Sequence, residues 1–139
     1  MKQRSGYLVL IVGMMFPAVA MADGTPMREG LWEITTTMEM PGMPFQPPPA
    51  KSRHCYTKEE LRDAKKRVPS ARGDCTVTDL KYSGKKMVWK VACTGENKGT
   101  GEGEMVYQSD SAYEGKMKFD MQEMSMTSRY KARRVGECP

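Results

Sequence analysis

The sequence is poor in the residues that enzymes most often use. Its 139 residues contain a single histidine, His54, and no pair of carboxylates that stands out as a candidate for acid–base catalysis. His54 lies next to Cys55, and a Cys/His pair could act as nucleophile and base. Neighbours on an extended segment point to opposite sides, however, and we expect Cys55 to be oxidised. The sequence therefore predicts a protein without enzymatic activity and without catalytic residues.

The chain also lacks a hydrophobic run long enough for a membrane span. Its uncharged apolar stretch, residues 7–22, has 16 residues, whereas a span needs roughly 20. Lys2 and Arg4 precede this stretch and Ala20-Met21-Ala22 ends it, which is the pattern of a secretory signal peptide. No cysteine follows directly to carry a lipid anchor. We expect cleavage of residues 1–22, or alternatively before Met21, and a single periplasmic domain over 23–139.

Charge of one sign is not concentrated anywhere along the sequence. Because the signal peptide holds two basic residues and no acid, the 22 basic and 17 acidic residues of the chain become 20 and 17, a net charge of +3. The densest basic runs are residues 65–67 and 129–134. A nucleic-acid-binding domain would need a basic stripe on one face. We therefore expect these charges to form a solvated surface and expect no nucleic-acid partner.

Close pairs of cysteines, which are typical of zinc sites, are absent as well. The four cysteines, Cys55, Cys75, Cys93 and Cys138, are separated by 20, 18 and 45 residues, and none is part of a C-x-x-C motif. An even number of cysteines in a small exported domain indicates disulfides, and four cysteines allow three pairings. The sequence therefore predicts two disulfides.

Strand spacing selects one of the three pairings. Residues 76–82 and 86–94 are rich in Val, Thr, Tyr and Trp, and Ser83-Gly84-Lys85 between them favours a hairpin turn. With Gly84 at the tip of the turn, Cys75 lies opposite Cys93, and Val77 lies opposite Val91 on the same side. This register predicts a Cys75–Cys93 disulfide and leaves Cys55 to pair with Cys138.

Alternating apolar residues and turn signals predict six strands, over residues 31–40, 76–82, 86–94, 104–108, 113–121 and 124–134. Thr57-Lys58-Glu59-Glu60 has the form of a capping box, so we expect a helix over residues 58–67. We interpret the proline-rich segment 41–49 as an exposed loop and the glycine-rich segment 95–103 as a flexible connection. Hairpin links without βαβ alternation predict an α+β fold that is mainly antiparallel β: a curled six-strand meander, partly closed and barrel-like, with one short helix.

Methionine is the compositional anomaly of the domain. Ten of the 117 residues after the signal peptide are methionine, and six of them form two groups: Met38, Met40, Met43 and Met121, Met124, Met126. Thioethers are soft ligands that suit Cu(I) or Ag(I). Such a site, built from Met38, Met40, Met121, Met124 and Met126, would require the first and last strands to be neighbours. The alternative, which we favour, is that these methionines are flexible fillers of the core.

A binding module is the third interpretation of the domain. A curled sheet with a Met-lined interior could hold an apolar molecule, and the exposed loop with Met43 and Phe45 is a candidate partner surface. We therefore expect a non-enzymatic binding or structural module for an apolar small molecule or a periplasmic protein. Binding of Cu(I) or Ag(I) is the alternative function, and no other cofactor is expected.

Several short motifs follow one another in a recognisable order. They are Gly30-Leu31-Trp32-Glu33, Pro41-Gly42-Met43-Pro44 with Pro47-Pro48-Pro49, Cys55-Tyr56-Thr57, Cys93-Thr94-Gly95, Tyr113-Glu114-Gly115 and Gly136-Glu137-Cys138. Together they resemble a family of small exported Gram-negative proteins catalogued as domain of unknown function 3617 (DUF3617). The resemblance covers essentially the whole chain after the signal peptide. It implies a periplasmic protein and supplies no activity, substrate or catalytic residue.

Overall fold

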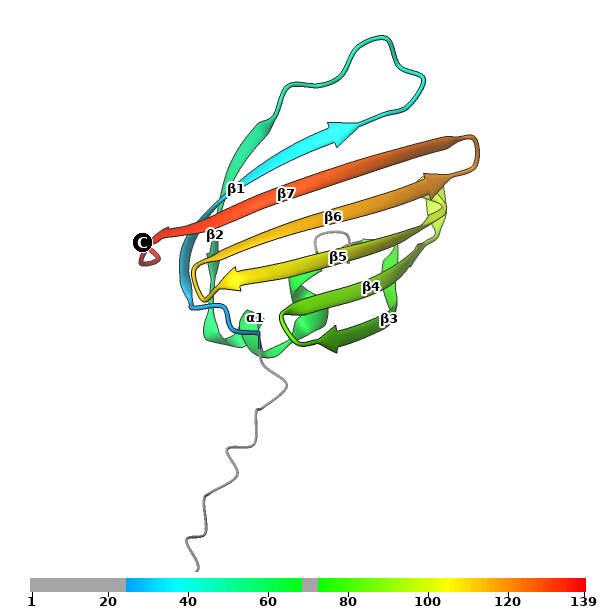
Figure 1. Ribbon diagram of the computed structural model, residues 1–139. Helices are drawn as coiled ribbons and strands as arrows, with labels where there is room; N and C mark the ends of the chain where they lie inside the picture. Colours follow the sequence, from blue (N-terminus) through cyan, green and yellow to red (C-terminus); the bar gives the residue numbers. More distant parts are fainter. Residues whose placement is uncertain (1–24, 69–72) are drawn as a thin grey trace, which may run out of the picture.

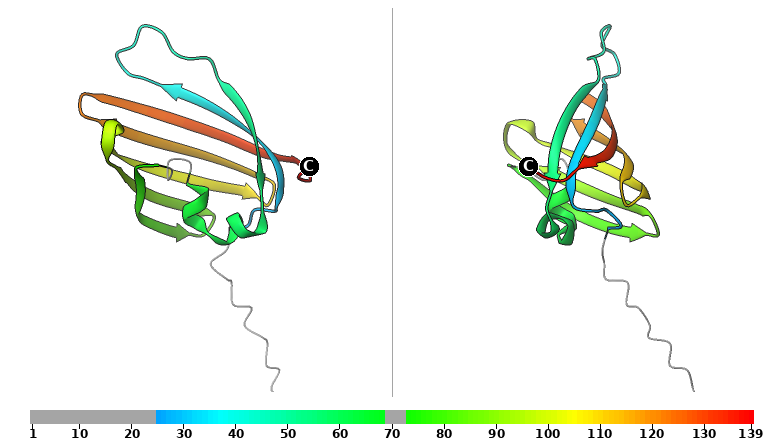
Figure 2. Two further views of the ribbon diagram at one scale, coloured as in Figure 1. Left: turned by 180° about the vertical axis from the view of Figure 1, so that it is seen from behind. Right: turned by 90° about the vertical axis from the view of Figure 1, so that its left-hand side faces the viewer.

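The computed structural model describes residues 25–68 and 73–139, so the expected signal peptide lies outside the described residues. One antiparallel sheet dominates the described part (Figures 1 and 2). Its seven strands are β1 (Gly30–Glu39), β2 (Ala50–Tyr56), β3 (Cys75–Ser83), β4 (Lys86–Cys93), β5 (Gly99–Ser109), β6 (Ala112–Met121) and β7 (Met124–Gly136). In space they follow the order β2-β1-β7-β6-β5-β4-β3.

The mainly antiparallel fold is confirmed, but the predicted strand number and closure are wrong. The missed strand is β2, whose sequence, AKSRHCY, is mostly polar and lacks β-branched residues. Its extended form is supported by pairing with β1, from Gly30 opposite Tyr56 to Thr36 opposite Ala50. Strands β2 and β3 are the two ends of the order, so the sheet stays open and does not close into a barrel.

The two faces of the sheet differ in chemistry because side chains alternate along each strand. In β4, Met87, Trp89 and Val91 are buried, whereas the residues between them are exposed. The exposed face is a lattice of charged pairs: Glu33, for example, lies 3.2 Å from Arg133 on β7 and 3.8 Å from Arg53 on β2. The sheet curls, and residues 58–67 lie on its concave side (Figure 2). Because Leu61 and Ala64 of this segment pack against the buried cluster, the apolar face is the concave one and the charged face is convex.

A short helical segment packs against part of the concave face. Helix α1 (Lys58–Arg62) begins with the predicted capping box, in which the Thr57 amide donates to Glu60 and the Glu60 amide donates to the Thr57 hydroxyl. The predicted short helix is confirmed, but it ends at Arg62 and not at Arg67, because Asp63 is extended. A 3-10 helix, η1 (Ala64–Arg67), follows, and the Asp63 carboxylate accepts from the Lys65 amide at its start.

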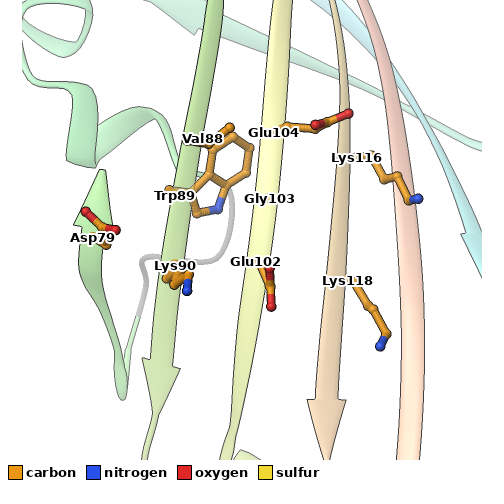
Figure 3. Close-up of a pocket in the computed structure, with 9 residues that line it drawn as sticks. All are labelled: Asp79, Val88, Trp89, Lys90, Glu102, Gly103, Glu104, Lys116 and Lys118. Atoms are coloured by element: carbon orange, nitrogen blue, oxygen red, sulfur yellow. The ribbon is translucent and has the colours of Figure 1, made fainter. Parts of the chain in front are cut away.

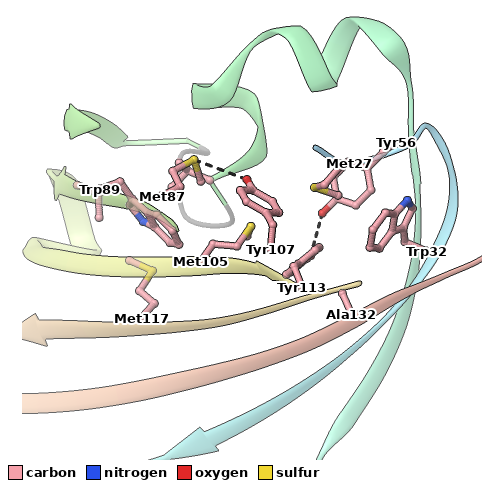
Figure 4. Packing of buried hydrophobic residues seen from close by; sticks show 12 residues of the cluster. Met27, Trp32, Tyr56, Met87, Trp89, Met105, Tyr107, Tyr113, Met117 and Ala132 are labelled. Carbon is pink, nitrogen blue, oxygen red and sulfur yellow. Dashed lines mark hydrogen bonds between the residues drawn. The ribbon is translucent and has the colours of Figure 1, made fainter. Parts of the chain in front are cut away.

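The core lies between this helical segment and the sheet (Figure 4). Its largest buried side chains are Trp32, Trp89, Tyr107, Met87 and Met105. Leu61 and Ala64 from the helical segment pack against this cluster, and Val68 is part of it.

In the β3–β4 hairpin, Cys75 lies opposite Cys93 as predicted, but the turn differs from the predicted one and a bulge compensates for the difference. Its turn is Gly84-Lys85, because Ser83 already pairs with Lys86, and this register alone would place Cys75 one residue away from Cys93. A bulge between Val77 and Asp79 shifts the register back. Cys75 therefore lies opposite Cys93, and both predicted disulfides are present, with Cα–Cα distances of 4.0 Å for Cys75–Cys93 and 5.5 Å for Cys55–Cys138.

The predicted flexible connection over 95–103 is wrong in its second half, because β5 begins at Gly99. The glycines are needed there because large side chains lie across the strand. A Cβ at Gly103 would come within 2.2 Å of the Trp89 ring, and one at Gly101 would come within 2.6 Å of the Met117 methyl group. The glycine-rich pattern therefore reflects close packing in a strand.

The first and last strands are neighbours, with β1 and β7 paired from Leu31 opposite Gly136 to Glu39 opposite Thr127. This pairing joins the β1–β2 hairpin to the meander formed by β3 to β7, and the Cys55–Cys138 disulfide links β2 to the chain after β7. Among the described residues, no helix has the length and apolar character needed to cross a membrane.

Candidate functional site

The concave face consists of two parts, one with buried side chains and one with side chains that are accessible to solvent. We call the buried cluster over β3, β4 and β5 the closed half; it includes Met87, Trp89, Met105 and Tyr107. We call the concave residues of β1, β7 and the end of β6 that stay accessible to solvent the open half; they are Ile34, Thr36, Met38, Phe119, Met121, Met124, Met126 and Tyr130. The open half is thus a largely apolar surface, with Met38 39% and Met124 53% exposed.

A hollow of about 340 Å³ lies where the open half meets the helical segment. Strands β1, β2, β6 and β7 and the end of η1 contribute its walls. The lining residues are Ile34, Thr36, Ser52, Arg53, His54, Tyr56, Lys66, Arg67, Val68, Tyr113 and Tyr130. The volume is within the usual range of small-molecule sites. The lining combines apolar side chains and phenols with basic groups, and it contains no carboxylate.

Tyrosines form the floor of this hollow. The Tyr56 and Tyr113 hydroxyls lie 3.1 Å apart, and Trp32 packs beside both rings (Figure 4). Burial raises the pKa of Tyr113 far above its ordinary value, and burial also raises the pKa of Tyr56 and of Tyr130. These phenols are therefore neutral hydrogen-bonding groups, unsuited to act as bases near neutral pH.

Arg67 is the most unusual residue of the hollow. Its side chain is 4% exposed, and its guanidinium group donates to the Tyr107 hydroxyl at 3.0 Å and to the Tyr82 hydroxyl. Its Nε atom is buried and has no hydrogen-bond partner within the described part of the chain. The prediction that residues 65–67 form a solvated basic run is therefore wrong for Arg67. The signal was helical spacing, because Arg67 follows Leu61 and Ala64, which pack on the core, at intervals of three.

His54 lies at the rim of the hollow. It is paired with Trp32 across β1 and β2, so its side chain is on the concave side, whereas Cys55 points the other way into its disulfide. His54 Nε2 is 3.1 Å from a Glu60 carboxylate oxygen, and its ring meets the Tyr56 ring edge to face. Cys55 and His54 therefore do not form a nucleophile–base pair.

The structure brings the five methionines of the predicted metal site to one end of the open half. Met121 lies directly opposite Met124 across the β6–β7 hairpin, and Met126 lies opposite Phe119. Glu39 is opposite Thr127, so continuing this register by one residue places Met40 opposite Met126. None of the five is in the buried core, which contains Met27, Met87, Met105 and Met117 instead. The expectation that the five fill the core is therefore wrong.

No group of three or more His, Cys, Asp or Glu side chains that could hold a metal ion occurs in residues 25–68 and 73–139. A metal at the open end would therefore depend on thioether sulfurs.

The predicted partner loop projects beyond the end of the sheet between β1 and β2 (Figure 1). The Gln46 side chain closes its base, because its amide oxygen accepts from the Met40 backbone amide and its nitrogen donates to the Met40 carbonyl, both at 3.0 Å. Met43 and Phe45 stay exposed, at 51% and 72%. The loop thus holds two large apolar side chains in solvent beside the methionine end of the open half.

The sequence model of a family described as protein of unknown function (DUF3617) matches residues 27–138. The chain belongs to this family. The match includes both disulfides, all seven strands and every residue that lines the hollow. No curated protein and no solved structure is similar enough to the chain to be matched.

The convex face of this DUF3617 protein carries a second hollow, of about 500 Å³, between Asp79 and the charged rows of β4, β5 and β6 (Figure 3). Its charged walls are partly satisfied from within the sheet: Lys86, on β4, donates to Glu104 at 2.7 Å and lowers the pKa of that carboxyl group. Acidic and basic groups alternate here, as on the rest of the convex face. We therefore regard the hollow on the concave face as the candidate site.

Proposed function

We propose that this protein is a non-enzymatic binding module that holds an apolar or amphipathic small molecule on the concave face of its sheet. The observation that carries the proposal is the open half, an apolar strand face that the helical segment leaves uncovered. Covering apolar surface is favourable by about 25 cal/mol for each Å² removed from water. A ligand that extended from the hollow along Ile34, Thr36 and Met38 would complete the core in the way that α1 and η1 complete the closed half.

The rigidity of the surrounding structure supports a preformed site. Antiparallel pairing fixes β1 on both sides, against β2 and β7. The Cys55–Cys138 disulfide links the end of β2 to the residues that follow β7. Two disulfides also favour an oxidising compartment. Together with the signal peptide expected from residues 1–22, they support our proposal that the module works in the periplasm.

The proposal can be tested by filling the hollow from one side of a strand. Ile34 lines it, whereas Thr35, the next residue, points to the convex face. We expect an environment-sensitive apolar dye to bind the wild-type protein and the Thr35→Trp control, and we expect the Ile34→Trp variant to lose this binding while retaining its melting temperature. Absence of dye binding by the wild type, or equal binding by both variants, would contradict the proposal. If the expected loss of binding is observed, native mass spectrometry of protein purified from its source would identify the molecule carried.

Soft-metal binding is the second candidate, and the pairing of β1 with β7 favours it by bringing the two methionine groups to one end of the sheet. We propose that Met121, Met124 and Met126, with Met38 or Met40, bind Cu(I) more tightly than about 1 µM, which is about −8 kcal/mol. Replacing Met121, Met124 and Met126 with leucine should abolish this binding and cost less than about 1.5 kcal/mol for each exchange. Equal Cu(I) affinity of wild type and variant would contradict the proposal.

A further inference from the structure

The charge of Arg67 is not compensated by the described part of the protein. Its hydrogen-bond partners among the described residues, Tyr107 and Tyr82, are phenols, and no described carboxylate forms an ion pair with it. The next four residues of the sequence after Val68, residues 69–72, are Pro-Ser-Ala-Arg and include no acid. A buried charge is strongly unfavourable unless it is paired and hydrogen-bonded, and buried guanidinium groups therefore normally face an anion.

The surroundings of Arg67 add to its positive charge. Lys66 and His54 line the same hollow, and none of its eleven lining residues is acidic. Arg53 also belongs to the lining, but its guanidinium group pairs with Glu33 on the convex face. The carboxylates nearest to these groups by ion pairing are outside the lining: Glu33 pairs with Arg53, Glu59 with Lys66 and Glu60 with His54. The basic side chains of the lining thus have carboxylate partners, whereas the buried Arg67 has none among the described carboxylates.

We propose that the ligand of the hollow carries a carboxylate, which is held at the Arg67 end while its alkyl chain lies along the open half. The inference rests on the proposed function and names the chemical class of the molecule bound there. A guanidinium group presents its N–H donors in a planar fork that matches the two oxygens of a carboxylate. The phenols of Tyr56, Tyr113 and Tyr130, neutral near pH 7, supply hydroxyl groups around the same hollow.

The test compares two probes with the same chain and different head groups, decanoate and 1-decanol. We expect isothermal titration of the disulfide-bonded protein at pH 7 to give an affinity about 10- to 100-fold higher for decanoate, the range of a charge-assisted hydrogen-bonded pair. Equal affinities would overturn this inference and leave the proposed function standing. Failure of both probes to bind would instead overturn the proposed function.

A pair of variants assigns the effect to Arg67. Arg67→Met removes the buried charge, and Arg62→Met removes an equal charge from an exposed position on α1, outside the lining of the hollow. We expect Arg67→Met to reduce the preference for decanoate to less than about threefold, and Arg62→Met to keep it. If Arg67→Met retains the full preference, Arg67 is not the anion-binding group and the inference fails.

The conservative variants cover the case in which Arg67→Met does not fold. Arg67→Lys keeps the charge and loses the planar fork, so it should bind decanoate about tenfold more weakly than wild type and bind 1-decanol unchanged. Arg62→Lys should match wild type with both probes. A purely structural arginine would give the opposite pattern: Arg67→Lys would lower the melting temperature and leave the ratio of the two affinities unchanged.

Discussion

The closed and open halves of the concave face are built from the same kind of strand, but their apolar side chains differ in exposure to solvent. Met105 on β5 is 2% exposed, and Met38 on β1 is 39% exposed, although both point to the concave side. The difference lies in what covers them. The chain from α1 to Val68 packs over the closed half, whereas the described residues bring no comparable element over Met38 and its neighbours. A strand pattern therefore shows which face is apolar but does not show whether that face is filled.

Matched truncations of one methionine in each half should show the largest contrast. Met105→Ala should lower the free energy of unfolding by about 2–5 kcal/mol, because it removes buried contacts and leaves a cavity. Met38→Ala should lower it by less than about 1 kcal/mol, because its side chain is already partly in water. Urea denaturation measures both values. Similar losses for the two variants would mean that Met38 is covered in solution, and the distinction between the halves would fail.

Adding a methyl group tests how tightly the closed half is packed. Gly103→Ala should destabilise by about 1–3 kcal/mol, since its Cβ would overlap the Trp89 ring that lies across the strand. Gly136→Ala is the matched control on β7, where a Cβ would meet nothing within 4 Å, and should change the stability by less than about 0.5 kcal/mol. Thermal unfolding of the two variants measures both changes in stability. A neutral Gly103→Ala exchange would show that Trp89 can move, as in a loosely packed core.

The smallest expected effect concerns the capping box at the start of α1, the helix that packs over the closed half. A hydrogen bond from the Thr57 amide, and to a lesser extent His54, hold the pKa of Glu60 below its ordinary value of 4.5. Its contribution to stability is therefore complete above about pH 4.5 and is lost as the pH falls through the lower pKa of the folded state. We expect this loss to be below about 1 kcal/mol, because the group is partly solvated.

Glu60→Gln is the matched variant, since glutamine also fits the capping box and does not titrate. Urea denaturation at pH 7 and pH 3 should give a smaller difference in unfolding free energy for this variant than for wild type. If the unfolding free energy changes equally between pH 7 and pH 3 in wild type and variant, Glu60 does not contribute to the acid sensitivity of the protein.

Local sequence signals predicted a large part of the fold. The hairpins, the capping box at Thr57 and the pairing of Cys75 with Cys93 follow from alternation, turn residues and spacing, which act over a few residues. Even there, the cysteine register depended on a bulge after Val77 that compensates for a turn one residue shorter than expected. Such a bulge has no clear local signal because it is defined by the partner strand.

The candidate site was much harder to predict from the sequence. The expected partner loop and methionine groups lie around the open half, but the hollow itself joins residues from β1, β2, β6, β7 and η1. Its central residue, Arg67, belongs to a basic run that is typical of an exposed surface. Burial of this arginine results from the placement of η1 over Tyr107 and Tyr82, which are 40 and 15 residues away along the chain.

Composition and periodicity were sufficient to establish an antiparallel, disulfide-linked sheet with one apolar and one charged face, because these properties arise from alternation of side chains and from cysteine spacing. Long-range packing established the rest: the pairing of β1 with β7, the strand character of β2, the choice of which methionines are buried, and the isolation of Arg67. Burial depends on elements that are distant in sequence, since a side chain leaves water only when another segment is placed over it. The open half is the part of the apolar face over which the chain places no such segment among its described residues.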